Sequence, residues 1–236
     1  MPRVSTGERT VLVTGAAGHL GRAVVSAFAA QGASLVLLDR QQALLDEAFG
    51  AGSSHLLLAV DLLDRAQTQA ALDAAIERFG RIDVLCHLAG GFRMGEPVHQ
   101  TSDADWDFLF DINTRTLRNV ARAAVPHLIA AGRGRIVTVG AAAALRGAAH
   151  MGAYAAAKSA TVRLTESMSA ELRDRGINVN CVLPTIIDTP ENRASMPDAD
   201  PTRWVSPDAL AAVIAFLASD AARAVHGVAL PVSGRV

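Results

Sequence analysis

The 236-residue sequence has few of the features that mark specialised classes of protein. It contains two cysteines, Cys86 and Cys181, and both lie in apolar segments, so we expect buried thiols rather than a disulfide. No cysteines and histidines cluster at the spacing of zinc ligands, and we therefore expect no metal. The formal net charge is −1 with dispersed charges, which argues against a nucleic-acid-binding surface.

Long hydrophobic runs are also missing. The first ten residues, MPRVSTGERT, contain no apolar signal core, and no apolar run approaches the length of a membrane span. We therefore expect a cytoplasmic protein that does not bind a membrane. Half of the residues are hydrophobic, which is enough for one large core, and no linker or internal repeat divides the chain. We predict a single domain over residues 1–236.

Short apolar runs alternate with longer helical patterns along the chain. The runs occupy residues 10–14, 34–39, 55–61, 83–90, 134–140, 177–184 and 227–232. Their nearly continuous apolarity is typical of strands that are buried on both faces. The segments long enough for crossover helices are 21–31, 64–79, 102–131, 151–174 and 206–218. This alternation predicts an α/β fold, a doubly wound parallel sheet with helices on both faces.

The first predicted strand leads directly into TGAAGHLG, residues 14–21. Gly15, Gly18 and Gly21 allow a tight turn and let the backbone approach a pyrophosphate at the start of the next helix. A tight turn alone also needs glycines, but the position between the first strand and a helix favours dinucleotide binding.

Acidic residues end the second and third predicted strands. A carboxylate at Asp39 would accept hydrogen bonds from the adenosine ribose and repel a 2′-phosphate, which favours NAD over NADP. Arg40 keeps NADP open, because its guanidinium can pair with that phosphate. Asp61 could contact the adenine amine, with Leu62 beside the ring.

Tyr154 and Lys158 lie one turn apart on a predicted helix, and Tyr154 is the only tyrosine in the chain. We expect the ammonium to lower the phenol pKa from about 10, which would prepare Tyr154 to donate a proton as a hydride arrives. An ordinary amphipathic helix can carry the same pair, but the glycine-rich loop before Tyr154 favours an active site.

Taken together, these motifs resemble the short-chain dehydrogenase/reductase superfamily over essentially the whole chain. The resemblance also rests on LAG (88–90), Asn113, YAAAK (154–158) and LP (183–184). It implies a seven-stranded Rossmann sheet of order 3-2-1-4-5-6-7, an NAD(P)-dependent oxidoreductase with a small-molecule substrate, and a homodimer or homotetramer. It also implies roles for three side chains: Tyr154 is the general acid/base, Lys158 holds the nicotinamide ribose, and Asn113 supports a proton relay. The implied cofactor contacts are Gly15, Gly18, His19, Leu20, Gly21, Asp39, Arg40, Asp61, Leu62, Ala89, Gly90, Gly91, Tyr154, Lys158, Pro184, Ile187 and Thr189.

Two departures from that superfamily bear on the substrate. The serine expected thirteen residues before the tyrosine is Ala141, which removes a hydrogen-bond donor to a substrate oxygen. The fourth strand ends in HLAG where two asparagines are usual, so we expect a rebuilt hydrogen-bond network. Segments 183–200 and 89–92 resemble those of dihydropteridine reductases, which also lack the serine. This second resemblance implies reduction of a conjugated C=N or quinonoid ring, on which no localised alkoxide forms.

Two other functions stay open at this point. One is an ordinary carbonyl or alcohol dehydrogenase with a displaced donor, and His150 or Arg146 could supply that donor. The other is an NAD-binding regulatory protein with low turnover. We further expect residues 185–205 to form a lid over the site. Substrate contacts in that lid would come from Asn192, Arg193 and Trp204.

Overall fold

The computed structural model describes residues 9–50 and 55–236, so the start of the chain examined for a signal core lies largely outside the described residues. Seven parallel strands form a sheet of order β3-β2-β1-β4-β5-β6-β7. The strands are β1 (Thr10–Thr14), β2 (Ser34–Asp39), β3 (His55–Ala59), β4 (Val84–His87), β5 (Gly134–Val139), β6 (Ile177–Pro184) and β7 (Ala229–Val232). The fold class and the strand order are therefore confirmed.

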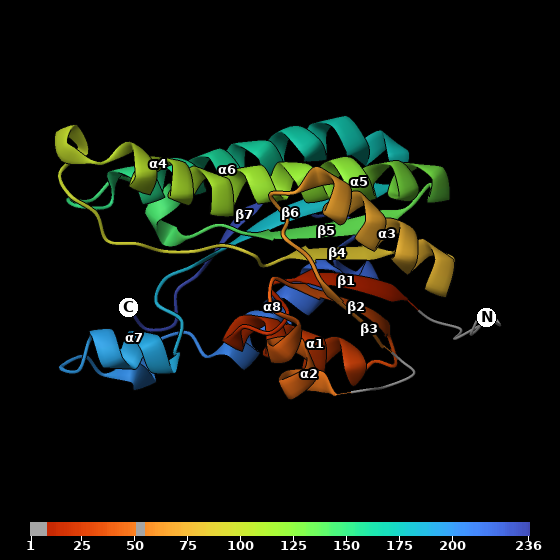
Figure 1. The fold of residues 1–236 in the computed structure, drawn as a ribbon, viewed down its shortest axis with the longest axis horizontal. Helices are drawn as coiled ribbons and strands as arrows, with labels where there is room; N and C mark the ends of the chain where they lie inside the picture. Colours follow the sequence, from red (N-terminus) through yellow and green to blue (C-terminus); the bar gives the residue numbers. More distant parts are fainter. Residues whose placement is uncertain (1–8, 51–54) are drawn as a thin grey trace.

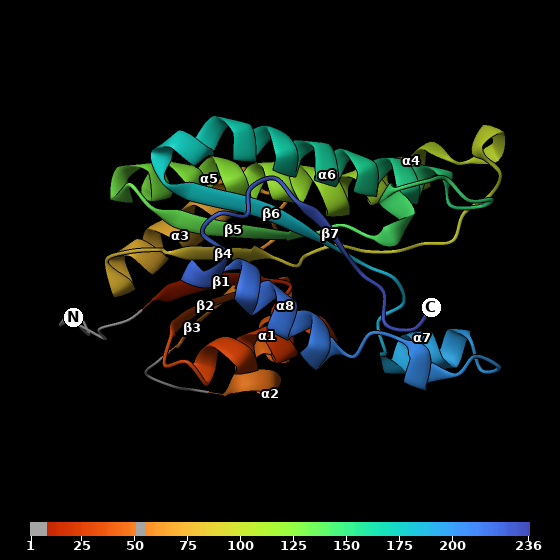
Figure 2. The same ribbon diagram turned by 180° about the vertical axis from the view of Figure 1, so that it is seen from behind.

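Helices cover both faces of this sheet (Figures 1 and 2). They are α1 (His19–Ala29), α2 (Gln42–Phe49), α3 (Arg65–Phe79), α4 (Asp103–Phe110), α5 (Thr116–Ala131), α6 (Gly152–Leu172), α7 (Pro190–Ser195) and α8 (Pro207–Leu217). The helices α1, α2 and α8 lie on one face, while α3, α5 and α6 lie on the other (Figure 1). Alternate residues of β1 enter different cores: Val11 and Val13 pack with α1 and α8, and Leu12 packs with α3 and α5. Burial on both faces explains the continuous apolar runs.

Two features of the helical layers differ from the sequence prediction. The helix predicted over 102–131 is interrupted by a π-helical turn, η2 (Asp111–Arg115), between α4 and α5. The short helices α2 and α7 were not predicted, and several strands are shorter than their apolar runs. The two cysteines are buried and free, as expected.

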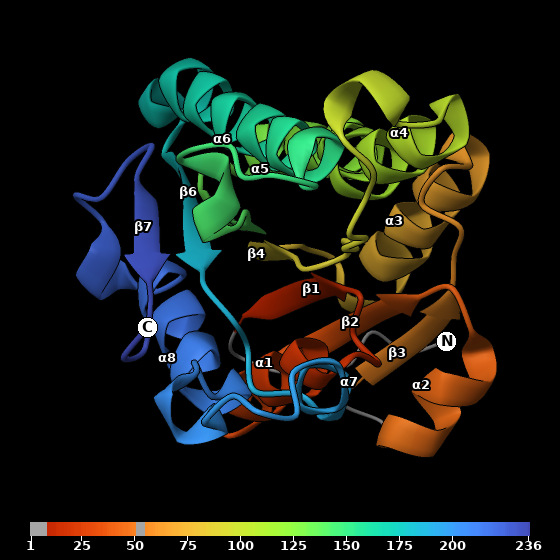
Figure 3. The same cartoon turned by 90° about the vertical axis from the view of Figure 1, so that its left-hand side faces the viewer.

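The functional edge of the sheet is the one at which the strands end. The chain runs outward from β1 to β3 and then returns to the other side of β1 at β4, so a crevice forms at the carboxyl ends of β1 and β4. The helix α7 projects beyond this edge below α4 and α6 (Figures 1 and 3). In the described part of the chain, no helix has the length and apolarity needed to cross a membrane.

Candidate active site

A cleft of about 450 Å³ lies at the carboxyl ends of the first four strands, where the glycine-rich turn meets residues 187–189 of the predicted lid. Most of the predicted cofactor contacts line it; Gly91, Pro184, Tyr154 and Lys158 do not. The predicted contacts that line the cleft are Gly15, Gly18, His19, Leu20, Gly21, Asp39, Arg40, Asp61, Leu62, Ala89, Gly90, Ile187 and Thr189. Sequence reasoning missed the remaining lining residues, Gln41, Val60, Leu63, Leu88, Ile112 and Thr116.

The three glycines of the turn serve different purposes. Gly15 has a φ of +65°, and a Cβ on Gly21 would lie 2.2 Å from the Gly15 carbonyl oxygen, so both are required by the backbone itself. Gly18 is different, since its Cβ would meet only that same oxygen, at 3.4 Å. Gly18 is also the N-cap of α1 and has no side-chain cap. The start of α1 therefore presents backbone N–H groups to the cleft, which is the arrangement that binds a pyrophosphate.

Asp39 is held in place by backbone donors. Its Oδ2 accepts a hydrogen bond from the Ala17 N–H (3.1 Å), and its Oδ1 accepts one from the Arg40 N–H (2.7 Å). These bonds fix the carboxylate at the end of β2, beside the cleft. A carboxylate oxygen has more than one lone pair, so each can still accept a bond from a ribose hydroxyl.

Tyr154 and Lys158 lie on α6, and both are substantially buried. The Lys158 Nζ donates to the Val139 carbonyl (3.0 Å) and lies 6.0 Å from the centroid of the Tyr154 ring. The ring of Tyr154 packs edge-on against Phe92, with centroids 4.9 Å apart. Burial raises the pKa of Tyr154 to about 12 and lowers the pKa of Lys158 to about 8. The expectation of a lowered tyrosine pKa is therefore corrected, because loss of solvation on burial sets the direction of the shift.

Asn113 is buried in the π-helical turn η2 and fixes the loop after β4. Its Oδ1 accepts from the Gly91 N–H (3.1 Å), and its Nδ2 donates to the carbonyls of Gly91 (2.9 Å) and Leu109 (3.0 Å). A Cβ placed on Gly90 would lie 2.9 Å from the Asn113 Oδ1 and 3.1 Å from the Lys158 Nζ. The structure thus brings Asn113 and Lys158 together around Gly90. Single π-helical turns inside longer helices often occur at functional sites.

His87, the first residue of the HLAG segment, is the centre of the rebuilt network. The Thr14 Oγ1 accepts from the N–H groups of Leu88 and Ala89, both at 3.1 Å, so its own hydrogen is free to point to the His87 Nδ1 (3.1 Å). We assign the Nε2–H tautomer on this ground, and that nitrogen then donates to the Thr116 Oγ1 (3.4 Å). Complete burial lowers the pKa of His87 to about 3, with a smaller contribution from Lys158. The ring is therefore neutral and connects β1, β4 and α5.

No hydroxyl group replaces the missing serine in the described loop before α6. Ala141 is only 7% exposed. Two hydroxyls on the flanking elements have other partners: the Ser159 Oγ on α6 donates to the Ala144 carbonyl (3.0 Å), and the Thr138 Oγ1 on β5 pairs with the Thr165 hydroxyl (2.7 Å). The oxyanion donor of an ordinary carbonyl reductase is therefore absent from its usual position.

His150 is a polar residue of the loop before α6 that shares a hollow with Tyr154. It has a φ of +63°, which is rare for a residue other than glycine, and its carbonyl accepts from the Gly95 N–H (2.8 Å). His150 and Tyr154 line the same small hollow, together with Arg93. Arg146 is exposed and does not line this hollow.

The lid side chains singled out from the sequence mostly hold the lid itself together. The Asn192 Nδ2 donates to the Ile187 carbonyl (2.8 Å), and Arg193 pairs with Asp188 at 2.6 and 2.7 Å. Trp204 is 7% exposed and does not line the cleft. Asn192 and Arg193 thus form hydrogen bonds within the segment, and Trp204 packs in its interior. A segment that leaves the sheet loses the sheet's hydrogen bonds, so its polar groups need partners of their own. Thr189 both caps α7 and lines the cleft.

Comparisons with known proteins agree with this geometry. The family model "short chain dehydrogenase" matches residues 9–200. The chain is 34% identical over 239 residues to the D-threitol dehydrogenase of Mycolicibacterium smegmatis, covering 96% of this chain and 92% of that protein. It is 35% identical over 238 residues to the cis-4-hydroxycyclohexanecarboxylate dehydrogenase of Sinomonas cyclohexanicum, covering 96% of each.

A solved structure extends the agreement to three dimensions. The 3-ketoacyl-(acyl-carrier-protein) reductase of Brucella melitensis, crystallised with NADH, superposes with a TM-score of 0.88 at 30% identity. The superposition covers 98% of this chain and 99% of that one. The sheet order, the glycine-rich turn and the Tyr154–Lys158 pair are those expected from the sequence. The chain therefore belongs to the short-chain dehydrogenase/reductase superfamily of NAD(P)-dependent oxidoreductases.

Proposed function

We propose that the protein is an NAD-preferring reductase whose substrate is a conjugated C=N or quinonoid ring of the dihydropteridine kind. The observation that carries this proposal is Ala141, which lies thirteen residues before Tyr154, where the superfamily resemblance implies a serine hydroxyl that serves a carbonyl substrate. The loop before α6 contains no serine or threonine, and the hydroxyls of Thr138 on β5 and Ser159 on α6 are bonded elsewhere. Reduction of a conjugated C=N group puts the proton on nitrogen and spreads the charge, so it needs no such donor.

The cleft residues fit a nicotinamide dinucleotide. Gly18 and the uncapped start of α1 suit its pyrophosphate, and Asp39 suits a ribose diol rather than a 2′-phosphate. The NADH named with the Brucella reductase supports the same type of cofactor. The bound cofactor supplies the hydride, and the chain supplies orientation and the proton.

Tyr154 is the proton donor in this proposal. Its raised pKa of about 12 keeps the phenol protonated at neutral pH. Because proton transfer is most efficient when the pKa of the acid lies near the working pH, Lys158 and the nicotinamide cation would have to lower this pKa during the reaction. Lys158, with a pKa of about 8, is mostly an ammonium at that pH and would stabilise the phenolate left after proton transfer. Asn113 fixes the loop at Gly90 and Gly91, against which these groups are positioned.

A second candidate is oxidation of a secondary alcohol, or reduction of a ketone, with His150 as the displaced donor. The strained backbone of His150 and its place in the hollow beside Tyr154 favour this reading. The names of the two dehydrogenases reported above point to hydroxyl-bearing substrates for those proteins.

Substitution of Ala141 by serine separates the two candidates. We expect Ala141→Ser to leave kcat/KM for a quinonoid dihydropteridine unchanged or lower, and to raise kcat/KM for a simple cyclic ketone. The gain could reach the roughly 10²–10³-fold effect of one oxyanion donor. The measurement is the ratio of the two kcat/KM values in wild type and variant.

The second candidate predicts a different pattern. If the wild-type protein already reduces the ketone efficiently, Ala141→Ser leaves the ratio unchanged and His150→Ala abolishes ketone reduction, then His150 is the donor. That result would overturn the proposal for C=N chemistry.

A further inference from the structure

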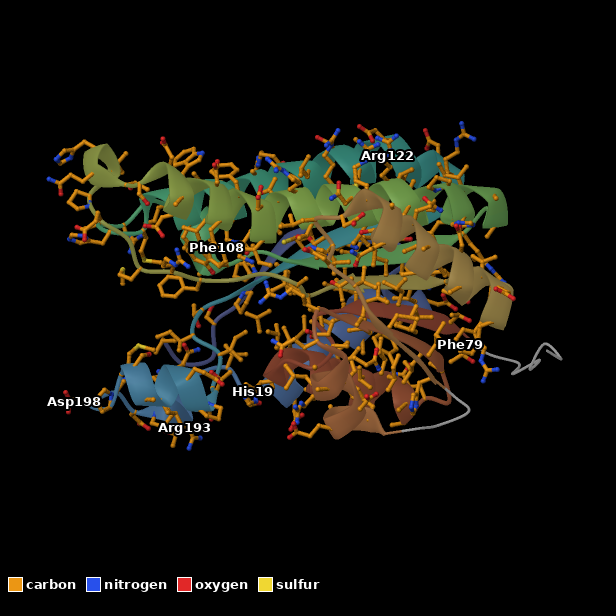
Figure 4. The ribbon with its side chains drawn as sticks, viewed as in Figure 1. His19, Phe79, Phe108, Arg122, Arg193 and Asp198 are labelled. Atoms are coloured by element: carbon orange, nitrogen blue, oxygen red, sulfur yellow. The ribbon has the colours of Figure 1, made fainter. Side chains whose placement is uncertain are left out.

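One hydrogen-bonded pair joins the lid to the glycine-rich turn. His19 is the first residue of α1, and Glu191 is the second residue of α7. The His19 Nε2 lies 3.1 Å from the Glu191 Oε1, although the residues are 172 positions apart in sequence. Figure 4 shows His19 at the margin of the α1 region that faces the lid. The pair therefore links two segments that both contribute residues to the lining of the cofactor cleft.

The pair lies at the part of the cleft suited to phosphate groups. Gly18 and His19 line the cleft from the turn, while Ile187 and Thr189 line it from the lid. The first turn of α1 contains no acidic residue, and its N-cap offers no side-chain acceptor. Because the start of a helix carries partial positive charge, it attracts an anion. In this structure the Glu191 carboxylate brings a negative charge to that region.

Glu191 is suited to be such an anion. The pKa of its carboxyl is lowered, first by a hydrogen bond from its own backbone N–H and then by the His19 ring, so it is ionised at neutral pH. The nearest charged neighbours of Glu191 along the lid, Asp188 and Arg193, pair with each other. Glu191 instead pairs with His19, outside the lid.

We propose that Glu191 is an internal competitor of the cofactor pyrophosphate for His19 and the start of α1. This inference rests on the proposed dinucleotide site. When the dinucleotide binds, its pyrophosphate takes the His19 ring as a partner and Glu191 is displaced. The carboxylate thereby weakens cofactor binding and favours cofactor release.

Binding of ADP-ribose tests this competition without any turnover. ADP-ribose carries the pyrophosphate and both riboses but no nicotinamide, and adenosine serves as the probe without phosphate. Calorimetry would give Kd values for wild type, Glu191→Gln and the control Asp198→Asn. Asp198 is a lid carboxylate at the end far from His19 (Figure 4), so its substitution makes the same change in charge.

We expect Glu191→Gln to tighten ADP-ribose binding about three- to fivefold, the upper part of the range for exposed charge pairs. Adenosine binding should not change, and Asp198→Asn should leave both Kd values within twofold of wild type. His19→Gln should weaken ADP-ribose binding, and adding Glu191→Gln to it should give less than half of the single-variant gain. The coupling between the two substitutions distinguishes competition for His19 from a general charge effect.

An unchanged or weakened affinity of Glu191→Gln for ADP-ribose would overturn the proposal, as would an equal gain with Asp198→Asn. Failure of wild type and Glu191→Gln alike to bind ADP-ribose would also overturn it. Both substituted side chains are exposed, so unfolding curves should confirm intact folding of each variant. If ADP-ribose binds as expected but no substrate is reduced, the proposed reaction fails while the competition stands.

Discussion

The buried histidine at the end of β4 makes stability depend on pH in a way that can be calculated. His87 is neutral in the folded protein, where burial lowers its pKa from 6.5 to about 3. In the unfolded chain the ring binds a proton near its ordinary value. The unfolded state therefore binds more protons than the folded state between those two values, and stability falls as the pH falls through this window.

The size of the effect follows from the two pKa values. The contribution of the neutral ring is complete above pH 6.5 and is lost progressively toward pH 3. A pH of 5 lies about 1.5 units below the unfolded-state pKa. Protonation of the unfolded chain therefore lowers the free energy of unfolding by about 2 kcal/mol relative to pH 7.5. This is a large part of the roughly 5–15 kcal/mol by which a domain is stable.

Urea unfolding of wild type and His87→Asn at pH 7.5 and pH 5 measures this term. We expect the free energy of unfolding of wild type to fall about 2 kcal/mol more than that of the variant between the two pH values. His99→Asn serves as the control, because His99 is exposed, and should behave as wild type. An equal pH dependence in wild type and His87→Asn would refute the neutral, buried state and the tautomer assigned from the Thr14 contact.

Three further predictions concern the cofactor and the catalytic groups. Because of the Asp39 carboxylate, we expect kcat/KM with NADH to exceed that with NADPH by at least tenfold, about 1.4 kcal/mol. A preference for NADPH would show that Arg40, rather than Asp39, determines the choice of cofactor. Gly90→Ala should lower kcat by about tenfold to a hundredfold, because its Cβ displaces the Asn113 amide and the Lys158 amine. Gly91→Ala should lower kcat far less, because its Cβ would lie at an ordinary contact distance of 3.4 Å from the Ile112 side chain. Lys158→Ala should reduce both kcat and the affinity for NADH measured by fluorescence, and an effect on neither would remove Lys158 from the site.

Much of the fold could be predicted because its causes are local or periodic. Strands such as β1 are buried on both faces, which produces apolar runs that a sequence displays directly. The glycine-rich turn is also a local requirement, as the 2.2 Å clash of a Cβ on Gly21 shows. These two features place the cleft at the ends of β1 and β4 before any coordinates are known.

The parts that could not be predicted depend on contacts between distant residues. The π-helical turn η2 holds Asn113 against Gly91, 22 residues away, and nothing in the local helical pattern distinguishes it from a continuous helix. The pKa of Tyr154 depends on burial rather than on its spacing from Lys158, so reasoning from spacing gave the wrong direction. Trp204 is an aromatic residue of the kind that often contacts a ligand, but its side chain is buried and does not line the cleft.

The proposed chemistry depends on Tyr154 as the proton donor, and Tyr154→Phe tests this role most directly. Kinetics with the best substrate, together with NADH titration by fluorescence, would be measured for wild type and variant. We expect turnover to fall at least 10²-fold, the lower range for a positioned acid, while the Kd for NADH stays within about threefold of wild type. If Tyr154→Phe keeps most of the wild-type kcat, the assigned acid is wrong and so is the proposed function of this site.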